Sequence, residues 1–223
     1  MNRPRILDLF CGGGGAAMGY HRAGFDVFGV DLDPQPNYPF DYAKADAFYF
    51  LDEWPARFDA IHASPPCQDH STTKAIGGTH GTGWMLAAMR DRLAAQNLPW
   101  VIENVEGAPL ARQPDLLGAN GLVLCGCMFP ELRGLLYEAR LFETSFPIPQ
   151  PSHCPHRWPQ TKMGRPPKAG ECMQVTGHFS GVAEAQRRMG TDWMTQGELA
   201  QAIPPAYTEY VGTHLLEHLV RAA

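Results

Sequence analysis

The sequence lacks any long apolar run. No window approaches the roughly 18 uninterrupted apolar residues that a membrane-spanning helix needs. The N-terminus already turns acidic at Asp8, which is too early for a secretory signal, so we expect a cytoplasmic protein. Charged residues are also few, at 18% of 223 residues, while hydrophobic residues make up 44%. This balance is typical of globular chains and excludes wholesale disorder.

Cysteine is scarce as well. Six cysteines in a chain of this length do not look like a disulfide framework, so we expect free thiols in a reducing compartment. A chain of this size buries about 70% of the surface that its unfolded form exposes. Its fold therefore needs no metal ion or disulfide bond for stability, and we expect one domain with at most a small appendage.

Net charge is −5, and it is unevenly spread. Residues 1–110 carry 8 Lys and Arg against 13 Asp and Glu, whereas 111–223 carry 10 of each. Positive charge gathers in residues 145–190, which we call the basic segment, with six Lys and Arg against two Glu. A polyanion, if one binds, should meet this segment. The alternative is a solvated basic loop.

Short apolar runs alternate with helical stretches along most of the chain. The alternation predicts an α/β fold with a doubly wound, mostly parallel sheet and a small loop-rich insertion. The predicted strands are 5–10, 26–30, 58–63, 100–103, 121–125 and 140–144. The predicted helices are 16–23, 84–96, 182–189, 195–202 and 206–220, with a break at Pro204-Pro205.

Three segments follow from this pattern. Residues 1–146 form the predicted main α/β domain. Residues 147–180 are rich in Pro, Gly and His and show no periodicity, so they predict a loop-rich insertion. Residues 181–223 are the predicted C-terminal helices, which we expect to pack back on the main domain.

Four glycines follow the first predicted strand directly, in Asp8-Leu9-Phe10-Cys11-Gly12-Gly13-Gly14-Gly15. Glycines there let the backbone adopt positive φ and approach a ligand closely. No Gly-Lys-Ser/Thr follows, so this is not a phosphate-binding P-loop. Asp31 ends the second strand, where a carboxylate can bind ribose hydroxyls, and Asp46 can accept from an adenine amino group. With Asp33 and Asp41 as competitors, the pattern suggests a nucleoside cofactor without a phosphate requirement.

Two further strand ends carry reactive groups. Cys67 follows Pro65-Pro66 in a rigid turn, which presents a thiol to a cleft as a nucleophile requires. Glu103 ends a strand among apolar residues, where desolvation should raise its pKa so that it can hold a proton. A thiolate paired with a protonated carboxyl group suits addition to C6 of a pyrimidine, after which C5 becomes nucleophilic. A buried thiol without a role is the usual alternative for a lone cysteine.

With these motifs the sequence resembles the DNA (cytosine-5) methyltransferases. The resemblance rests on the ordered run Asp8 to Gly15, on Pro65-Pro66-Cys67-Gln68, and on Glu103-Asn104-Val105. Weaker matches are Arg140-Leu141-Phe142-Glu143 and 202–210. It covers 4–146 well and 182–220 loosely, and implies a Rossmann-like methyltransferase fold, a monomer, and a source in a phage, a phage-infected bacterial cell or a mobile element.

The resemblance also implies residue roles. S-adenosylmethionine lies in the glycine-loop cleft, and a flipped cytosine is the acceptor. Cys67 adds to cytosine C6, Glu103 contacts N3 and the exocyclic amine, and Arg140 contacts O2 or positions the thiol. The implied cofactor residues are Phe10, Cys11, Gly12, Gly13, Gly15, Asp31, Asp46 and Pro66. The expected DNA contacts are Gln68, Arg157, Lys162, Arg165 and Lys168.

Three departures from the family pattern bear on the substrate. Glu138 stands where the family carries the first arginine of Gln-x-Arg-x-Arg, and an acid there repels phosphate unless it is paired, with Arg133 as the suggested partner. The family's Gly-Asn-Ser is replaced within 203–207. Only about 30 residues stand in place of a recognition subdomain, and each base contact contributes about 1–3 kcal/mol of discrimination, so we expect short or relaxed sequence preference.

Two rival functions remain open. One is a pyrimidine C5 transferase that acts on RNA or free nucleotides, or that moves a modified one-carbon group from a donor such as carboxy-S-adenosylmethionine. The other is a catalytically silent nucleic-acid-binding module, although such a module has no need of a nucleophile.

The sequence also contains candidate metal ligands. Enough zinc ligands are present in His153, Cys154, His156, Cys125, Cys127 and Cys172. Their spacing matches no standard zinc motif, so we expect unligated side chains and no metal. Elemental analysis of the purified protein would decide.

Overall fold

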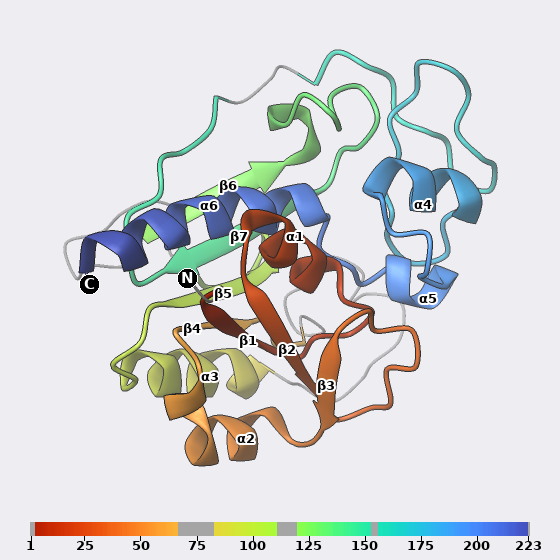
Figure 1. Ribbon diagram of the computed structural model, residues 1–223. Helices are drawn as coiled ribbons and strands as arrows, with labels where there is room; N and C mark the ends of the chain where they lie inside the picture. The colour runs from red at the N-terminus through yellow and green to blue at the C-terminus, as the bar shows by residue number, and fades with distance from the viewer. Residues whose placement is uncertain (1–2, 67–82, 111–119, 153–155, 223) are drawn as a thin grey trace.

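The fold is taken from a computed structural model, which describes residues 3–66, 83–110, 120–152 and 156–222 (Figure 1). Its centre is a seven-stranded sheet in the order β3-β2-β1-β4-β5-β7-β6. The strands are β1 Arg5–Leu9, β2 Asp26–Asp31, β3 Asp41–Lys44, β4 Ala60–Ala63, β5 Trp100–Val105, β6 Asn120–Cys125 and β7 Ala139–Thr144.

The sheet is mostly parallel, as the alternating sequence predicts. Strands β3, β2, β1, β4 and β5 pair in parallel, whereas β7 runs antiparallel to both β5 and β6. Residues 126–138 join β6 to β7 without a helical crossover. An antiparallel neighbour needs no such crossover, which is why the pattern changes at this edge.

Helices cover both faces of the sheet (Figure 1). One face carries α1 Gly15–Ala23 and α6 Pro205–Ala222, and the other carries α2 Ala47–Glu53 and α3 Gly83–Ala94. Each face of the sheet has its own hydrophobic core. Side chains alternate between the faces along β1, so Ile6 belongs to the core under α1 and α6, and Leu7 and Leu9 belong to the core under α2 and α3. The predicted doubly wound α/β architecture is confirmed.

Helices α1 and α6 approach each other very closely. A Cβ atom at Gly19 would lie 2.0 Å from Thr208 Oγ1 and 2.2 Å from the Pro205 carbonyl oxygen. The Thr208 hydroxyl donates to the Ala16 carbonyl oxygen at 2.9 Å. The C-terminal helix is thereby locked over the helix that follows the glycine loop.

Several element boundaries differ from the prediction. Pro205 begins α6 instead of breaking the chain before it, because the first helical position needs no N–H donor. Helix α5 is a single turn, Gln196–Leu199, with a capping box between Thr195 and Glu198. Helix α4, Val182–Met189, ends at Gly190 in the left-handed conformation, as predicted.

Two regions were less well predicted. Helix α2 was not predicted at all, because its Phe and Tyr residues favour strands. In the described part of 147–180 there is no helix or strand, only the bridges Leu136↔Met173 and Gln160↔Cys172. Short 3-10 turns are η1 Pro55–Arg57 and η3 Gly126–Met128. None of the described helices has the length and hydropathy to cross a membrane.

Candidate active site

A cleft of about 680 Å³ opens at the carboxyl ends of the parallel strands. This is where ligands bind in open α/β sheets. Among the residues that line it are ten of those predicted for catalysis or cofactor binding: Phe10, Cys11, Gly12, Gly13, Gly15, Asp31, Asp46, Pro66, Glu103 and Arg140. The fold therefore brings together groups that lie up to 130 positions apart in the sequence.

The glycine loop forms one wall of the cleft. Phe10 has a φ of 60°, which is rare for a residue with a side chain, and Gly12 and Gly14 also have positive φ. A left-handed Phe costs about 1–3 kcal/mol, and such strain gathers at ligand sites. A Cβ at Gly15 would lie 2.4 Å from the Ile203 carbonyl oxygen, so only glycine lets the C-terminal segment close over the loop.

Asp31 is held rigidly at the end of β2. Its carboxylate accepts from the backbone N–H of Gly12 at 2.9 Å and of Asp33 at 3.0 Å. A carboxylate has about four acceptor sites, so capacity remains for hydroxyl groups in the cleft. Of its sequence competitors, Asp33 also lines the cleft, but Asp41 is not among the lining residues.

Asp46 has a structural task that the sequence analysis missed. It is the N-cap of α2, and its side chain accepts from the backbone N–H of Tyr49 at 2.9 Å. The cap uses Oδ1, and the residue still lines the cleft. Beside it, Phe48 packs edge-on against Phe10, with 6.2 Å between ring centroids, and adds an aromatic wall that was not predicted.

Glu103 is a buried residue of β5 that lines the cleft. Burial raises its pKa to about 7, the Arg140 guanidinium opposes that rise, and Glu138 adds to it. Arg140 Nε lies 3.6 Å from Glu103 Oε1, and its Nη2 donates to Glu138 Oε1 at 2.5 Å. Two buried carboxyl groups thus share one guanidinium, so a proton is retained near pH 7.

The partner suggested for Glu138 was wrong. Arg133 donates from Nε to the Cys127 carbonyl oxygen at 3.2 Å, whereas Glu138 pairs with Arg140. Residues two apart along an extended chain point to the same face, which explains the pairing. Burial raises the pKa of Glu138, and Arg140 opposes the rise.

Asn104 positions the proline turn, a role that sequence reasoning missed. Its Nδ2 donates to the Pro65 carbonyl oxygen at 2.9 Å, and its Oδ1 accepts from the Val105 backbone N–H at 3.0 Å. Pro66 follows and lines the cleft. The predicted nucleophile Cys67 and the predicted DNA contact Gln68 lie outside the described residues.

The C-terminal segment covers the glycine loop. No motif in the sequence indicated these contacts. Glu198 accepts from Asn37 Nδ2 at 3.0 Å and lies against Gly13, where a Cβ would come within 2.9 Å of the Glu198 Cβ. Trp193 Nε1 donates to the Gly13 carbonyl oxygen at 2.9 Å.

The predicted DNA contacts of the basic segment do not line this cleft. Arg157, Lys162 and Lys168 are exposed. Arg165 instead makes a two-pronged ion pair with Glu171, at 2.7 and 2.6 Å. Those hydrogen bonds lower the pKa of Glu171 to about 2, so much of the charge of Arg165 is neutralised locally.

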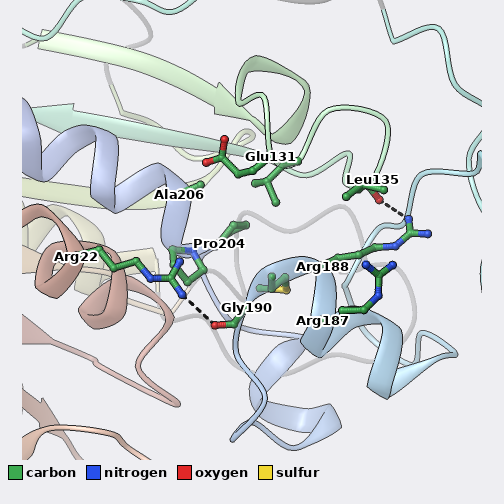
Figure 2. Close-up of a pocket in the computed structure, with 11 residues that line it drawn as sticks. Arg22, Glu131, Leu135, Arg187, Arg188, Gly190, Pro204 and Ala206 are labelled. Carbon is green, nitrogen blue, oxygen red and sulfur yellow. Dashed lines mark hydrogen bonds between the residues drawn. The ribbon is translucent and has the colours of Figure 1, made fainter.

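A second cavity, of about 290 Å³, lies between α1, α4 and the start of α6 (Figure 2). Its guanidinium groups are held by the protein. Arg22 donates to the Gly190 carbonyl oxygen at 3.2 Å, and Arg188 donates to the Leu135 carbonyl oxygen at 2.6 Å. Arg187 and Arg188 also pair with Glu184. These contacts fasten α4 to the main body.

No family model and no curated protein sequence matches this chain. Solved structures do match its fold. A protein described as a candidate DNA modification methyltransferase, encoded within an E. coli prophage, has a TM-score of 0.63 at 16% identity, over 98% of this chain and 99% of that one.

Two eukaryotic structures are also similar. The Dnmt2 methyltransferase of S. pombe has a TM-score of 0.63 at 15% identity, over 97% of this chain and 99% of that one. The Entamoeba histolytica methyltransferase EhMeth has a TM-score of 0.58 at 12% identity, over 98% and 99%. At these identities the likeness shows that the chain has the Rossmann-like methyltransferase fold.

Proposed function

We propose that this protein transfers a methyl group from S-adenosylmethionine to C5 of cytosine in DNA. The observation that carries the proposal is the meeting of a proton-holding Glu103, Arg140 and the proline turn with the glycine loop in one cleft. The similar prophage structure is described as a candidate DNA modification methyltransferase, and it spans nearly the same length. Both facts favour this function over other methyl transfers.

The residues of the cleft fit the proposed donor. Asp31 retains acceptor capacity for ribose hydroxyls, and Phe10 and Phe48 offer aromatic surface for an adenine. A Cβ at Gly12 would meet no atom within 4 Å, so the loop leaves open space beside its backbone. When bound, S-adenosylmethionine supplies an electrophilic methyl group on a sulfonium. Cys11 and Pro66 complete the proposed donor site.

The acceptor chemistry belongs to the chain's own groups. The Cys67 thiolate forms a bond to cytosine C6, the C5=C6 electron pair shifts to form C4=C5, and the N3=C4 pair moves to N3, where Glu103 donates a proton. Arg140 contacts O2. C5 then forms its bond to the methyl carbon as the sulfonium–methyl bond breaks. The C5 proton then leaves to water, the C6–sulfur bond breaks to restore the thiolate, and the N3 proton returns to Glu103.

DNA must present the base outside its helix, because a buried carboxyl in a cleft cannot reach a stacked cytosine. We assign backbone contacts to Gln68, Arg157, Lys162 and Lys168. Arg165 takes a lesser part because it is paired with Glu171. So small a region makes few base contacts, so sequencing of methylated random DNA should show a short or relaxed site, and a long fixed site would contradict this assignment.

The test of function uses labelled S-adenosylmethionine and cytosine-containing DNA, followed by digestion to nucleosides and mass spectrometry. We expect 5-methylcytosine from the natural sequence and none from Cys67→Ala. Cys172→Ala, which removes a buried cysteine that does not line the cleft, should keep the product. DNA containing 5-fluorocytosine should trap a covalent adduct at Cys67, and an absent adduct with donor present would refute the mechanism.

Glu138 supports a second candidate. Its buried carboxyl takes up part of the Arg140 charge, which weakens the attraction for a polyanionic duplex and favours RNA or free pyrimidine nucleotides as acceptors. The same mass spectrometry discriminates these, since the polymer that gains mass identifies the acceptor and the mass gained identifies the group. A modified donor such as carboxy-S-adenosylmethionine would give a larger mass. A binding-only protein would give no modified nucleoside.

A further inference from the structure

Three metal-ligating side chains that play no part in the proposed reaction meet at the carboxyl end of β6. Cys125, Cys127 and His156 place their ligand atoms within 4.8 Å of one another. Within the described ranges, no other group of three His, Cys, Asp or Glu side chains meets this way. His156 comes from the basic segment, 29 positions after Cys127, so the cluster joins two distant parts of the chain.

The distances suit a tetrahedral zinc ion. Zn–S bonds of about 2.3 Å and Zn–N bonds of about 2.0 Å, at tetrahedral angles, place neighbouring ligand atoms about 3.5–3.8 Å apart. Cys125 Sγ and His156 Nε2 lie 3.3 Å apart, slightly shorter than that range, so a small side-chain shift admits the ion. Two thiolates and an imidazole are also a donor set that zinc prefers over magnesium or calcium.

The surrounding structure fixes all three residues. Cys125 ends β6 and Cys127 lies in the turn η3, and both are buried. Between them, a Cβ at Gly126 would lie 2.4 Å from the Leu136 carbonyl oxygen, so the turn closes only with glycine. His156 packs on the Tyr137 ring at 4.2 Å between centroids. The Tyr137 hydroxyl accepts from the Trp158 backbone N–H at 3.0 Å.

We propose that Cys125, Cys127 and His156 bind a structural Zn²⁺ ion that fastens the basic segment to the sheet. A tetrahedral ion takes one further ligand, from water or another side chain. Cys127 and Cys125 supply thiolates from the protein interior, and the exposed His156 leaves the ion an approach from solvent. Sequence spacing alone led us to expect no metal, because two of these ligands form a Cys-x-Cys pair and the third comes from an irregular loop.

The location ties the site to the cleft without making it catalytic. In the β6–β7 ladder, Cys125 lies opposite Ala139, and Leu124 lies opposite Arg140. Ala139 stands between Glu138 and Arg140 in the chain. A zinc ion at the end of β6 therefore holds rigid the strand pair that presents Arg140 to the cleft and that carries its partner Glu138, and it holds the basic segment beside them.

The test is elemental analysis of the full chain, purified without chelator, reduced and equilibrated with zinc chloride before removal of free metal. We expect about one zinc per chain, as four-coordinate structural sites bind tightly. His156→Asn changes an exposed side chain and should fold, yet lose most of the zinc. Cys127→Ser should do the same, whereas Cys172→Ser, an equally buried cysteine outside the cluster, should keep it.

Cobalt gives a second readout that does not depend on activity. Co²⁺ bound by thiolates shows a sulfur-to-metal charge-transfer band, which should appear in the natural protein and Cys172→Ser and disappear in Cys127→Ser. A natural protein that holds no stoichiometric zinc after equilibration would overturn the proposal. Zinc retained in full by both His156→Asn and Cys127→Ser would also overturn it, because the ion would then lie elsewhere.

Discussion

At the scale of single residues, the Glu103 carboxyl sets the pH range in which the cleft can act. Its pKa is about 7, chiefly because it is buried. The proposed role needs the protonated form, which is lost as the pH rises through that value. We therefore expect kcat/KM to fall tenfold per pH unit above about 7.

Glu103→Gln should remove that basic limb and lower kcat by about 100-fold or more, because an amide cannot deliver a proton. Initial rates between pH 6 and 9 measure both effects. A profile of the natural protein that stays flat from pH 6 to 9 would contradict the role of Glu103.

Glu138 acts on the reaction through its neighbours. Its carboxyl draws the Arg140 guanidinium away from Glu103 and raises the pKa of Glu103. Glu138→Gln should release Arg140 toward Glu103, so the basic limb of the pH profile moves to lower pH. Glu131→Gln, an exposed carboxyl that does not line the cleft, is the control and should leave the limb in place. A limb unmoved in Glu138→Gln would show that Glu138 is only structural.

Where a motif fixed the place of a residue near a strand end, the structure brings that residue to the cleft. Asp31 and Glu103 line the cleft because parallel strands bring their carboxyl ends to one edge. Arg140 joins them from the amino end of the antiparallel β7, where it lies opposite Val105 at the carboxyl end of β5. Pairing was harder to predict, since the choice between Arg133 and Arg140 for Glu138 depends on where the chain turns after β6. Asn104 was passed over because its partner is a backbone carbonyl, which leaves no trace in the sequence.

At the scale of elements, the closeness of α1 and α6 depends on glycines at their contact, of which Gly19 is the most tightly enclosed. Gly19→Ala would force Cβ against Thr208 and the Pro205 carbonyl, so the helices must separate. We expect a loss of about 1–3 kcal/mol in the free energy of unfolding, a magnitude typical of overpacked cores. Urea denaturation measures it.

Gly197 is the matched control, because it also lies in a helix but a Cβ there would meet no atom within 4 Å. Gly197→Ala should be neutral or stabilise the fold by up to about 1 kcal/mol through helix propensity. If both substitutions cost the same, the α1–α6 contact is not as tight as the geometry indicates.

Elements with a clear period or a glycine stop were predicted, and elements that depend on tertiary contact were not. Helix α4 was predicted from Val182 to Met189, since Gly190 ends it. Helix α2 was not predicted because its residues favour strands, and because Asp46 was interpreted as a cofactor-binding residue instead of an N-cap. The contacts of Trp193 and Glu198 with the glycine loop were not predicted, because they join segments some 180 positions apart in the sequence.

At the scale of the whole molecule, topology decides where chemistry can occur. The order β3-β2-β1-β4-β5-β7-β6 places β1, β4 and β5 side by side. The glycine loop follows β1, the proline turn follows β4, and Glu103 lies within β5 near its carboxyl end. The alternating sequence predicted a parallel sheet but not this order. The antiparallel β7 was not foreseen, because the sequence between β6 and β7 offers no periodic signal.

The pH dependence of stability should reveal the buried Asp8 beneath the cleft. Its side chain is fully buried and accepts from the Tyr38 hydroxyl at 3.4 Å. Burial raises its pKa to about 8, the Tyr38 hydrogen bond opposes the rise, and Asp31 adds to it. Between an unfolded pKa of about 3.9 and 8, the folded state holds a proton that the unfolded state has lost, so stability falls as the pH rises through this window.

Asp8→Asn removes this ionisation and keeps an acceptor for Tyr38. It should flatten the decline and raise the free energy of unfolding at pH 8 by about 2 kcal/mol, while changing little at pH 4. Urea denaturation at pH 4, 6 and 8 measures the difference, and Asp91→Asn on the surface of α3 should follow the natural protein. Glu103 adds to the decline up to about pH 7, so some slope should persist in Asp8→Asn. Equal slopes in both proteins would mean that Asp8 is already ionised in the folded state.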